Sequence, residues 1–234
     1  LMPAGLGDHL ATALTAARRA APREDVTLWL LGLDDPVCQA CATMLSDAER
    51  ERIGRMAFDR DRRRMAAARG TLKVLLGAWV GQSPEQLRLS ARDSGKPWMP
   101  DHPGVFFNLS HSQSSALIAI TATGEVGVDL EVLRQESDLL ELARRVLTPR
   151  EQAELLSDKG AMDRDRRFFQ GWTRKEACLK AAGWGLALDP QEFEVGTGAD
   201  SRRIRLAHAG QCSDMDLMSL SLAPQVVAAL AIQR

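Results

Sequence analysis

The chain has 234 residues, of which 45% are hydrophobic and 26% are charged, and its formal net charge at pH 7 is −1. This length and composition predict a globular protein with one large domain or two small ones. The near-neutral charge gives no indication of a nucleic-acid-binding protein, and no apolar stretch approaches the roughly 20 residues needed to span a bilayer.

The first half of the sequence predicts helices followed by short strands. Ser46 and Glu49 form a capping box, which is typical of the first turn of a helix. Apolar residues between Ala68 and Trp79 recur at helical spacing and indicate a longer helix after it. We predict helices at 8–20, 46–58 and 61–80, a turn at 34–36, and strands at 26–31, 87–90, 105–109 and 115–121.

Four cysteines are spread along the chain, and only Cys38 and Cys41 have CxxC spacing. A zinc site needs four ligands, but the sequence has neither a second CxxC nor paired histidines. The region does not resemble the thioredoxin-like βαβ unit in which a redox-active pair begins a helix. We therefore expect reduced thiols and, because no uninterrupted apolar signal segment is evident near the N-terminus, a cytoplasmic protein.

A domain boundary is predicted at Thr123-Gly124, after the paired strands of the first half. We expect an N-terminal α+β half at residues 1–123 and a C-terminal α+β half at residues 124–234. For the second half we predict helices at 139–146, from 149 onward and at 163–182, and strands at 126–131, 193–195, 204–206, 217–222 and 226–232.

Basic residues cluster around the start of the predicted 61–80 helix, although the whole chain is nearly neutral. Such a run is most simply a solvated helix face. A local basic patch on a neutral protein also suits a small polyanionic ligand, so both interpretations stay open. The residues are Arg60, Arg62, Arg63, Arg64, Arg69 and Lys73.

Two carboxylates lie on one side of the predicted strand at 126–131. Residues i and i+2 of a strand face the same way, so Asp129 and Glu131 project together while their neighbours face the core. Two adjacent carboxylates both stay ionised when a cation lies between them, and Mg²⁺ prefers such oxygen ligands. Mn²⁺ suits the same ligands. Taken alone, this pattern more often marks a solvent-facing strand.

Glu176 and Lys180 are one turn apart on the predicted 163–182 helix. A surface ion pair is the simplest interpretation. However, Phe169 and Trp172 flank this face, so it is not plainly solvated. A buried glutamate could act as a general base, because burial raises its pKa, or it could complete a metal shell. Lys180 could neutralise charge on a leaving phosphate.

Ser110 and His111 follow the predicted strand at 105–109. Adjacent strand residues point to opposite faces, and the chain has no G-x-S-x-G motif, so the pair does not indicate a serine hydrolase. Hydroxyl and imidazolium donors suit phosphate oxygens, whereas a histidine satisfied in the core fits equally well. No P-loop or Rossmann glycine motif is present to hold a nucleotide.

Four blocks together resemble one enzyme family, the 4′-phosphopantetheinyl transferases of the surfactin-synthetase-activating type. They occur in the family's order and span about residues 95–186. The chain departs from the family in having no tyrosine and a bulky Trp184, which bears on partners more than on activity. The blocks are Gly95-Lys96-Pro97, Phe107-Asn108-Leu109-Ser110-His111-Ser112, Gly127-Val128-Asp129-Leu130-Glu131 and Trp172-x-x-Lys175-Glu176-Ala177-x-x-Lys180-x-x-Gly183-x-Gly185-Leu186.

The resemblance implies an α+β fold of two similar halves, related by a pseudo-two-fold axis within a monomer, with the site in the cleft between them. It implies a holo-[carrier-protein] synthase, which moves the phosphopantetheine arm of coenzyme A onto a serine of an apo acyl or peptidyl carrier protein and releases 3′,5′-ADP. Mg²⁺ is the implied metal, and no nucleic acid or membrane partner is expected. A Mg²⁺-dependent nucleotide pyrophosphohydrolase and a non-catalytic coenzyme A-binding module are the alternatives.

The resemblance also implies roles for individual residues. Asp129, Glu131 and Glu176 would hold the metal, and Glu176 would be the base for the incoming serine. Asp129, Glu176 and Lys180 are thus the expected catalytic residues, with Lys180 stabilising the leaving phosphate. The predicted contacts to coenzyme A are Arg69, Lys96, Ser110, His111, Lys175 and Lys180, and Arg50, Arg52 and Arg55 are further candidates for its 3′-phosphate.

Overall fold

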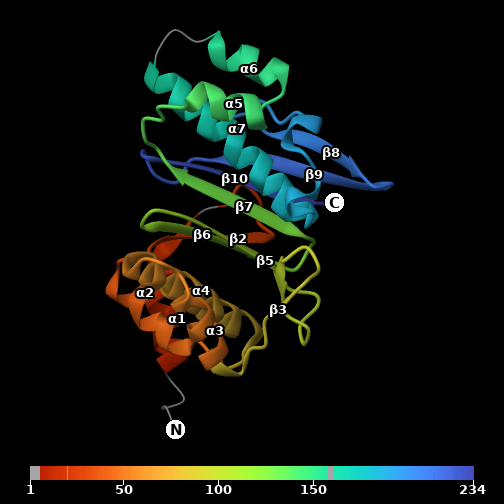
Figure 1. The fold of residues 1–234 in the computed structure, drawn as a ribbon. Coiled ribbons are helices and arrows are strands. Elements are labelled where there is room, and N and C mark those ends of the chain that lie inside the picture. The colour runs from red at the N-terminus through yellow and green to blue at the C-terminus, as the bar shows by residue number, and fades with distance from the viewer. Residues whose placement is uncertain (1–5, 20, 158–160) are drawn as a thin grey trace.

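The structure, a computed structural model, describes residues 6–19, 21–157 and 161–234 (Figure 1). Its first half holds α1 (Leu6–Ala13), β1 (Arg18–Arg19), β2 (Val26–Gly32), α2 (Pro36–Cys41), α3 (Asp47–Gly54), α4 (Asp59–Val80), β3 (Ser90–Ala91), β4 (Pro97–Trp98), β5 (Phe106–Ser112) and β6 (Ser115–Thr121). Its second half holds β7 (Val126–Val132), α5 (Leu139–Val146), α6 (Pro149–Leu156), α7 (Ala161–Ala182), β8 (Arg202–His208), β9 (Gln211–Leu220) and β10 (Val226–Gln233). The predicted α+β class is confirmed.

The same strand order recurs in the two halves. Sheet 1 has the order β1-β2-β6-β5 and sheet 2 the order β7-β10-β9-β8. In each sheet the first long strand pairs antiparallel with the last, and the last pairs with the strand before it in sequence. The change from one sheet to the other lies between Thr121 and Val126, and the domain boundary at Thr123-Gly124 stays a prediction.

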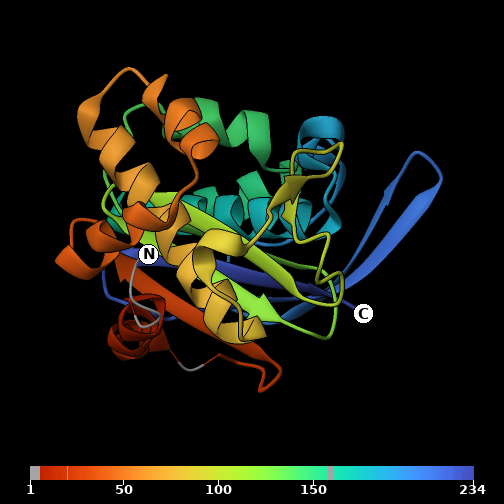
Figure 2. The same ribbon diagram turned by 90° about the horizontal axis from the view of Figure 1, so that it is seen from below.

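Four hydrophobic clusters among the described residues hold the layers of the molecule together. The inner faces of both sheets share one core, which includes Leu28, Leu117, Val128 and Leu230. The outer face of sheet 1 is covered by the helices of the first half, and the outer face of sheet 2 by α7. Figure 1 shows the resulting order of helices, sheet, sheet and helices, and Figure 2 shows the paired strands β8 and β9 projecting from one side of the molecule. No helix in the described part of the chain is long and apolar enough to cross a membrane.

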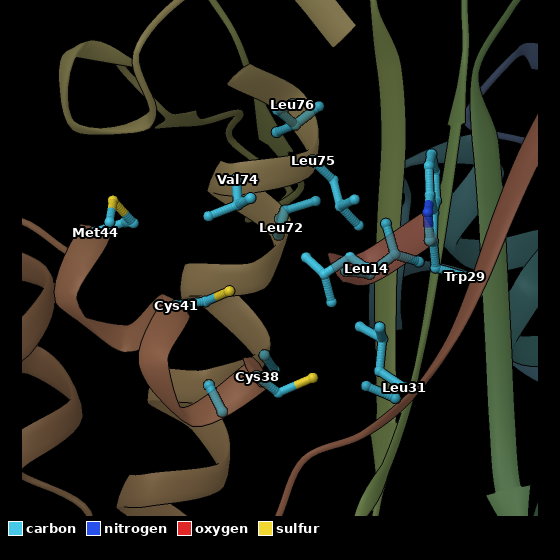
Figure 3. Packing of buried hydrophobic residues seen from close by; sticks show 14 of the residues in the cluster. Leu14, Trp29, Leu31, Cys38, Cys41, Met44, Leu72, Val74, Leu75 and Leu76 are labelled. Atoms are coloured by element: carbon cyan, nitrogen blue, oxygen red, sulfur yellow. The ribbon is translucent and has the colours of Figure 1, made fainter. Parts of the chain in front are cut away.

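The CxxC cysteines are packing residues of the first-half core. Cys38 and Cys41 are buried and free, and Figure 3 shows them among leucines of α4 and β2. Burial raises the pKa of the Cys41 thiol to about 11, so this thiol stays protonated at neutral pH. Gly70 permits this packing, because a Cβ there would lie 2.2 Å from the carbonyl oxygen of Cys41. The expectation of reduced, structural thiols agrees with this environment.

Local signals at helix ends mostly predicted the observed boundaries. The capping box at Ser46 and Glu49 forms with both of its hydrogen bonds. The predicted 34–36 turn is observed at residues 33–35 and leads directly into α2, because the Asp35 carboxylate accepts from the amide of Val37 and Pro36 occupies the first turn of the helix. The predicted 8–20 helix is shorter, because α1 ends at Ala13, a 3₁₀ helix continues only to Ala17 and β1 follows; Ala20 lies outside the described residues.

Two predicted strands are corrected. Most of the 87–90 segment is irregular, and only its last residue enters the short β3. The 193–195 segment forms no strand, although Phe193 and Val195 are buried. The amide of Val195 donates to the Glu151 carboxylate instead of to a neighbouring strand, at 2.6 Å. The apolar residues of the 193–195 segment therefore predicted its burial correctly, but the strand hydrogen bonds that they also predicted do not form.

A charged cluster joins the two halves at one end. Arg23 Nη2 lies 2.6 Å from Asp25 Oδ2, and Arg23 Nη1 lies 3.0 Å from Asp216 Oδ2 in β9. The hydrogen bonds from Arg23 lower the pKa of Asp25 to about 2. A carboxylate whose folded-state pKa lies below its unfolded value stabilises the fold above the unfolded pKa, and this stabilisation is lost as the pH falls through the folded value.

We expect Asp25→Asn to lower the free energy of unfolding by about 1 to 2 kcal/mol at pH 7, because it removes this depressed carboxylate. The difference from the unaltered protein should shrink between pH 4 and pH 2, where Asp25 itself becomes protonated. Urea unfolding across this range measures it, with Asp101→Asn at an exposed ion pair as the control. A difference that stays constant down to pH 2 would contradict the assignment.

Candidate functional site

Strand β7 and helix α7 bring a carboxylate and a lysine together between the halves. Their backbones approach closely at Gly127, where a Cβ would lie 2.1 Å from the carbonyl oxygen of Ala177. This approach lets Lys180 Nζ reach Asp129 Oδ1, at 2.6 Å. Asp129 is 5% exposed, so the pair is largely withdrawn from water. The structure thus brings together two residues that the sequence placed on separate elements.

The three predicted metal ligands share one electrostatic environment. Burial raises the pKa of Asp129, against the opposing influence of Lys180 and Ser110. Burial also raises the pKa of Glu176, and the neighbouring charge of Asp129 adds to the rise. The charge of Glu131 also raises the pKa of both Asp129 and Glu176. The site therefore holds more negative charge than Lys180 alone can balance.

The donor set fits a hard divalent cation, although it is not assembled around one. Among the described residues, no three His, Cys, Asp or Glu side chains converge as a ready metal site. Asp129 Oδ2 is buried and has no hydrogen-bond partner, and no described residue makes a hydrogen bond or ion pair with the Glu176 carboxylate. An orphaned buried carboxylate oxygen beside a second unpartnered carboxylate is what a Mg²⁺ ion would satisfy. Glu131 is held instead by Ser112 and Arg134, at 2.7 and 2.9 Å.

Ser110 and His111 lie inside β5, and not after a strand that ends at Leu109. They face opposite sides of sheet 1, as the alternation of strand residues requires. Ser110 Oγ donates to Asp129 Oδ1 at 2.7 Å, which places it at the carboxylates. His111 lies on the side of α4, where a cavity of about 460 Å³ is lined by Met56, Arg60, Asp61, Arg64, His111 and Gln113. The opposite directions agree with the rejection of a Ser–His nucleophile pair.

Arg69 on α4 is the best placed of the arginines considered for a phosphate. Its Nε is buried without a hydrogen-bond partner. Burial lowers the pKa of its guanidinium group, and the charge of nearby Arg52 lowers it further. Two neighbouring guanidinium groups, one of them with an unsatisfied donor, favour an anion, and the nearby Glu49 carboxylate supplies only part of the countercharge. By contrast, Arg50 and Arg55 each pair with a carboxylate on their own helix.

Lys96 is engaged in joining the halves. Its Nζ lies 2.7 Å from Glu125 Oε2, and it donates to the carbonyl oxygens of Val126 at 3.0 Å and Ala181 at 3.2 Å. These contacts account for all three hydrogens of the ammonium group. In this structure Lys96 therefore fixes the start of β7 against the end of α7, which argues against the predicted contact with a coenzyme A phosphate.

Lys175 is also engaged with protein groups, and its side chain is 0% exposed. Its Nζ lies 2.8 Å from Glu151 Oε2, donates to the carbonyl oxygen of Pro190 at 2.6 Å, and lies 4.7 Å from the centre of the Phe193 ring. An ammonium group with these partners has no surface left for a ligand. The predicted contact of Lys175 with coenzyme A therefore does not fit this geometry.

Ser112 and Arg134, for which no role was predicted, support the carboxylates. Ser112 donates to Glu131, and Arg134 approaches the same carboxylate from the loop after β7. A signal for Ser112 was present, because Asn108, Ser110 and Ser112 recur at every second position of a strand. For Arg134 there was no comparable signal, since its contact depends on the path of a loop.

Comparison with known proteins gives matches over both halves. Residues 35–123 match the family model "4′-phosphopantetheinyl transferase, N-terminal", and residues 125–228 match that of the 4′-phosphopantetheinyl transferase superfamily. The chain is 39% identical over 215 residues to the 4′-phosphopantetheinyl transferase HetI of Nostoc sp., covering 89% of this chain and 88% of HetI. It is 29% identical over 156 residues to the 4′-phosphopantetheinyl transferase Sfp of Bacillus subtilis, covering 65% of this chain and 66% of Sfp.

Proposed function

This chain belongs to the 4′-phosphopantetheinyl transferase superfamily and transfers the phosphopantetheine arm of coenzyme A to apo carrier proteins, and we propose that Asp129, Glu131 and Glu176 hold a Mg²⁺ ion for this transfer. The observation that carries the metal assignment is the buried, unpartnered Oδ2 of Asp129. When bound, the ion would neutralise charge on the pyrophosphate of coenzyme A. Mn²⁺ would serve the same ligands.

Glu176 is the proposed base for the serine hydroxyl of the carrier protein. Burial and the charge of Asp129 raise its pKa, and a carboxylate with a raised pKa accepts a proton more readily at neutral pH. It takes the proton directly or through a water molecule, as the serine oxygen attacks the phosphorus next to the pantetheine. Lys180 neutralises the charge that develops on the departing 3′,5′-ADP.

Coenzyme A is proposed to lie between the halves, in contact with residues from both. From β5, His111 approaches its phosphates, whereas Ser110 donates its one hydrogen to Asp129 and serves the site through that carboxylate. Arg69 with Arg52 approaches the 3′-phosphate from the α3–α4 region. The unpartnered Nε of Arg69 supports this placement. We exclude Lys96 and Lys175, because both ammonium groups are buried and fully engaged.

The acceptor is proposed to dock near α5 and α6, where Leu140 and Leu156 are exposed large apolar residues. Carrier proteins of polyketide, nonribosomal peptide, siderophore and fatty-acid pathways are all compatible with this surface. A monomeric enzyme in the cytoplasm stays our prediction.

We expect a carrier protein to gain the mass of one phosphopantetheine arm when it is incubated with this enzyme, coenzyme A and Mg²⁺, and to gain none when a chelator is added. Intact-mass spectrometry on a panel of apo carriers measures this and ranks them. An undiminished gain with chelator would overturn the metal assignment. Coenzyme A cleaved without any modified carrier would favour the pyrophosphohydrolase.

A further inference from the structure

Three polar side chains of β5 give β7 the hydrogen-bond acceptors that a neighbouring strand would otherwise provide. They lie at every second residue of β5, and each accepts a hydrogen bond from a β7 amide that lies 20 positions further along the chain. The two strands belong to different sheets, which Figure 1 shows side by side at the boundary between the halves. The bonds are Val128 N to Asn108 Oδ1 at 3.0 Å, Leu130 N to Ser110 Oγ at 3.3 Å and Val132 N to Ser112 Oγ at 3.3 Å.

The position of β7 in its sheet explains why such a row is needed. β7 is an edge strand that pairs only with β10, so every second amide points away from its sheet. Val128 is 0% and Leu130 1% exposed, so water does not reach these amides freely. A buried amide without an acceptor is costly. The β5 side chains supply the acceptors without merging the two sheets into one.

Two members of the row also hold the carboxylates of the site. Ser110 Oγ donates to Asp129 Oδ1, and Ser112 Oγ donates to Glu131 Oε2, both at 2.7 Å. A serine hydroxyl has one hydrogen to donate and lone pairs that accept. The β7 amide and the carboxylate therefore use both capacities at once, which restricts the hydroxyl to one orientation. Asn108 makes the same amide contact without a carboxylate beside it.

We propose that Asn108 and Ser112 are positioning residues of the transferase. The row sets the register of β7 against β5, and hence of the carboxylates against the half that carries His111 and Arg69. Ser112 in addition holds the Glu131 carboxylate on the side of Asp129, and Asn108 acts on register alone. The part that concerns Glu131 rests on the proposed function, since it takes Glu131 as a metal ligand.

Ser112→Ala tests the row on metal-free protein through amide hydrogen exchange. We expect the Val132 amide to exchange at least about tenfold faster in the variant, because it loses its acceptor, while Leu130 keeps Ser110 and is unchanged. Ser115→Ala is the matched control: Ser115 lies opposite Ser112 in the β5–β6 pairing, and its hydroxyl makes no hydrogen bond to any described residue. An equal exchange rate of the Val132 amide in both variants would overturn the proposal that the β5 row supports β7.

The same variants test the link to Glu131 through the Mg²⁺ requirement of carrier modification. For Ser112→Ala we expect the half-saturating Mg²⁺ concentration to rise about 3- to 10-fold, because a single charge-assisted hydrogen bond to Glu131 is lost, while KM for coenzyme A stays within about twofold. Ser112→Thr regains this hydrogen bond and should restore the normal Mg²⁺ requirement. An unchanged Mg²⁺ requirement would overturn the positioning of Glu131. If the rate of transfer by the unaltered enzyme does not depend on Mg²⁺, the proposed metal function fails. Amide exchange in the metal-free protein still tests the row of hydrogen bonds in that case.

Asn108→Ala separates register from carboxylate contact. We expect faster exchange at Val128 and a melting temperature lower by roughly 2 to 10 °C, because a buried amide loses its acceptor. Transfer should fall through kcat with the Mg²⁺ requirement unchanged, since Asn108 touches no carboxylate. A melting temperature and Val128 exchange equal to those of the unaltered protein would overturn the register role.

Discussion

Glu176→Gln is expected to lower kcat for carrier modification by about 100- to 10,000-fold, the range that a positioned general base contributes. Glutamine keeps the shape of the side chain but neither accepts the serine proton nor carries charge for a metal ion. The fold should survive, because Glu176 makes no hydrogen bond or ion pair with any described residue. Removing one of several neighbouring carboxylates should leave the melting temperature unchanged or raise it, since repulsion with Asp129 is relieved.

The expected fall in kcat is measured by the initial rate at which the carrier protein gains mass. The expected melting temperature is measured by thermal unfolding of the metal-free enzyme. Glu194→Gln is the control, because its carboxylate is 45% exposed and pairs with the exposed Arg150 away from the carboxylates of the site. A variant that retains near-normal kcat and its Mg²⁺ requirement would refute both roles of Glu176. A variant that loses activity and is also markedly less stable would point to a structural glutamate instead.

Lys175→Met is expected to lower the free energy of unfolding by about 3 to 5 kcal/mol, which corresponds to roughly 6 to 20 °C in melting temperature. The substitution leaves the Glu151 carboxylate, 1% exposed, without its cationic partner. Glu151 also accepts from the amides of Val195 and Gly196, at 2.6 and 2.9 Å, so it cannot turn toward water without breaking that loop. The cost arises from an uncompensated buried charge.

A second substitution distinguishes this account from a role in coenzyme binding. Lys175→Met combined with Glu151→Gln should recover much of the lost stability, because the amide oxygen still accepts from the loop while the unpaired charge is gone. Arg150→Met, at an exposed ion pair on the same helix α6, should change stability little. A stable Lys175→Met enzyme with a greatly raised KM for coenzyme A would instead support the predicted contact of Lys175 with coenzyme A.

Residues that act through their near neighbours in sequence were predicted well. The capping box at Ser46 was visible as a spacing of three residues, and both of its hydrogen bonds form. The alternation along β7 predicted that Val128 and Leu130 enter the core while Asp129 lies on the other face. The helical spacing of Glu176 and Lys180 likewise placed both on the face of α7 that approaches β7.

The lysines of the matched motifs show what local sequence patterns do not predict. Lys175 and Lys180 lie on one helix, yet Lys180 reaches Asp129 and Lys175 is enclosed with Glu151. Lys96 likewise joins groups that lie 30 and 85 positions away in the chain. A motif records that a lysine is required, but it does not record which carboxylate or carbonyl group receives it.

The sequence by itself determined the family, the helices with clear caps, and the faces of the strands that carry acids. These follow from periodicity and hydrogen bonds within a few residues, and from motifs whose order survives in the chain. Only the tertiary structure decided which lysines are free to meet a ligand, and that Asn108 and Ser112 support β7 across the boundary between the halves. The physical reason is that burial and hydrogen-bond partners depend on how two separately formed sheets pack, which no local spacing specifies.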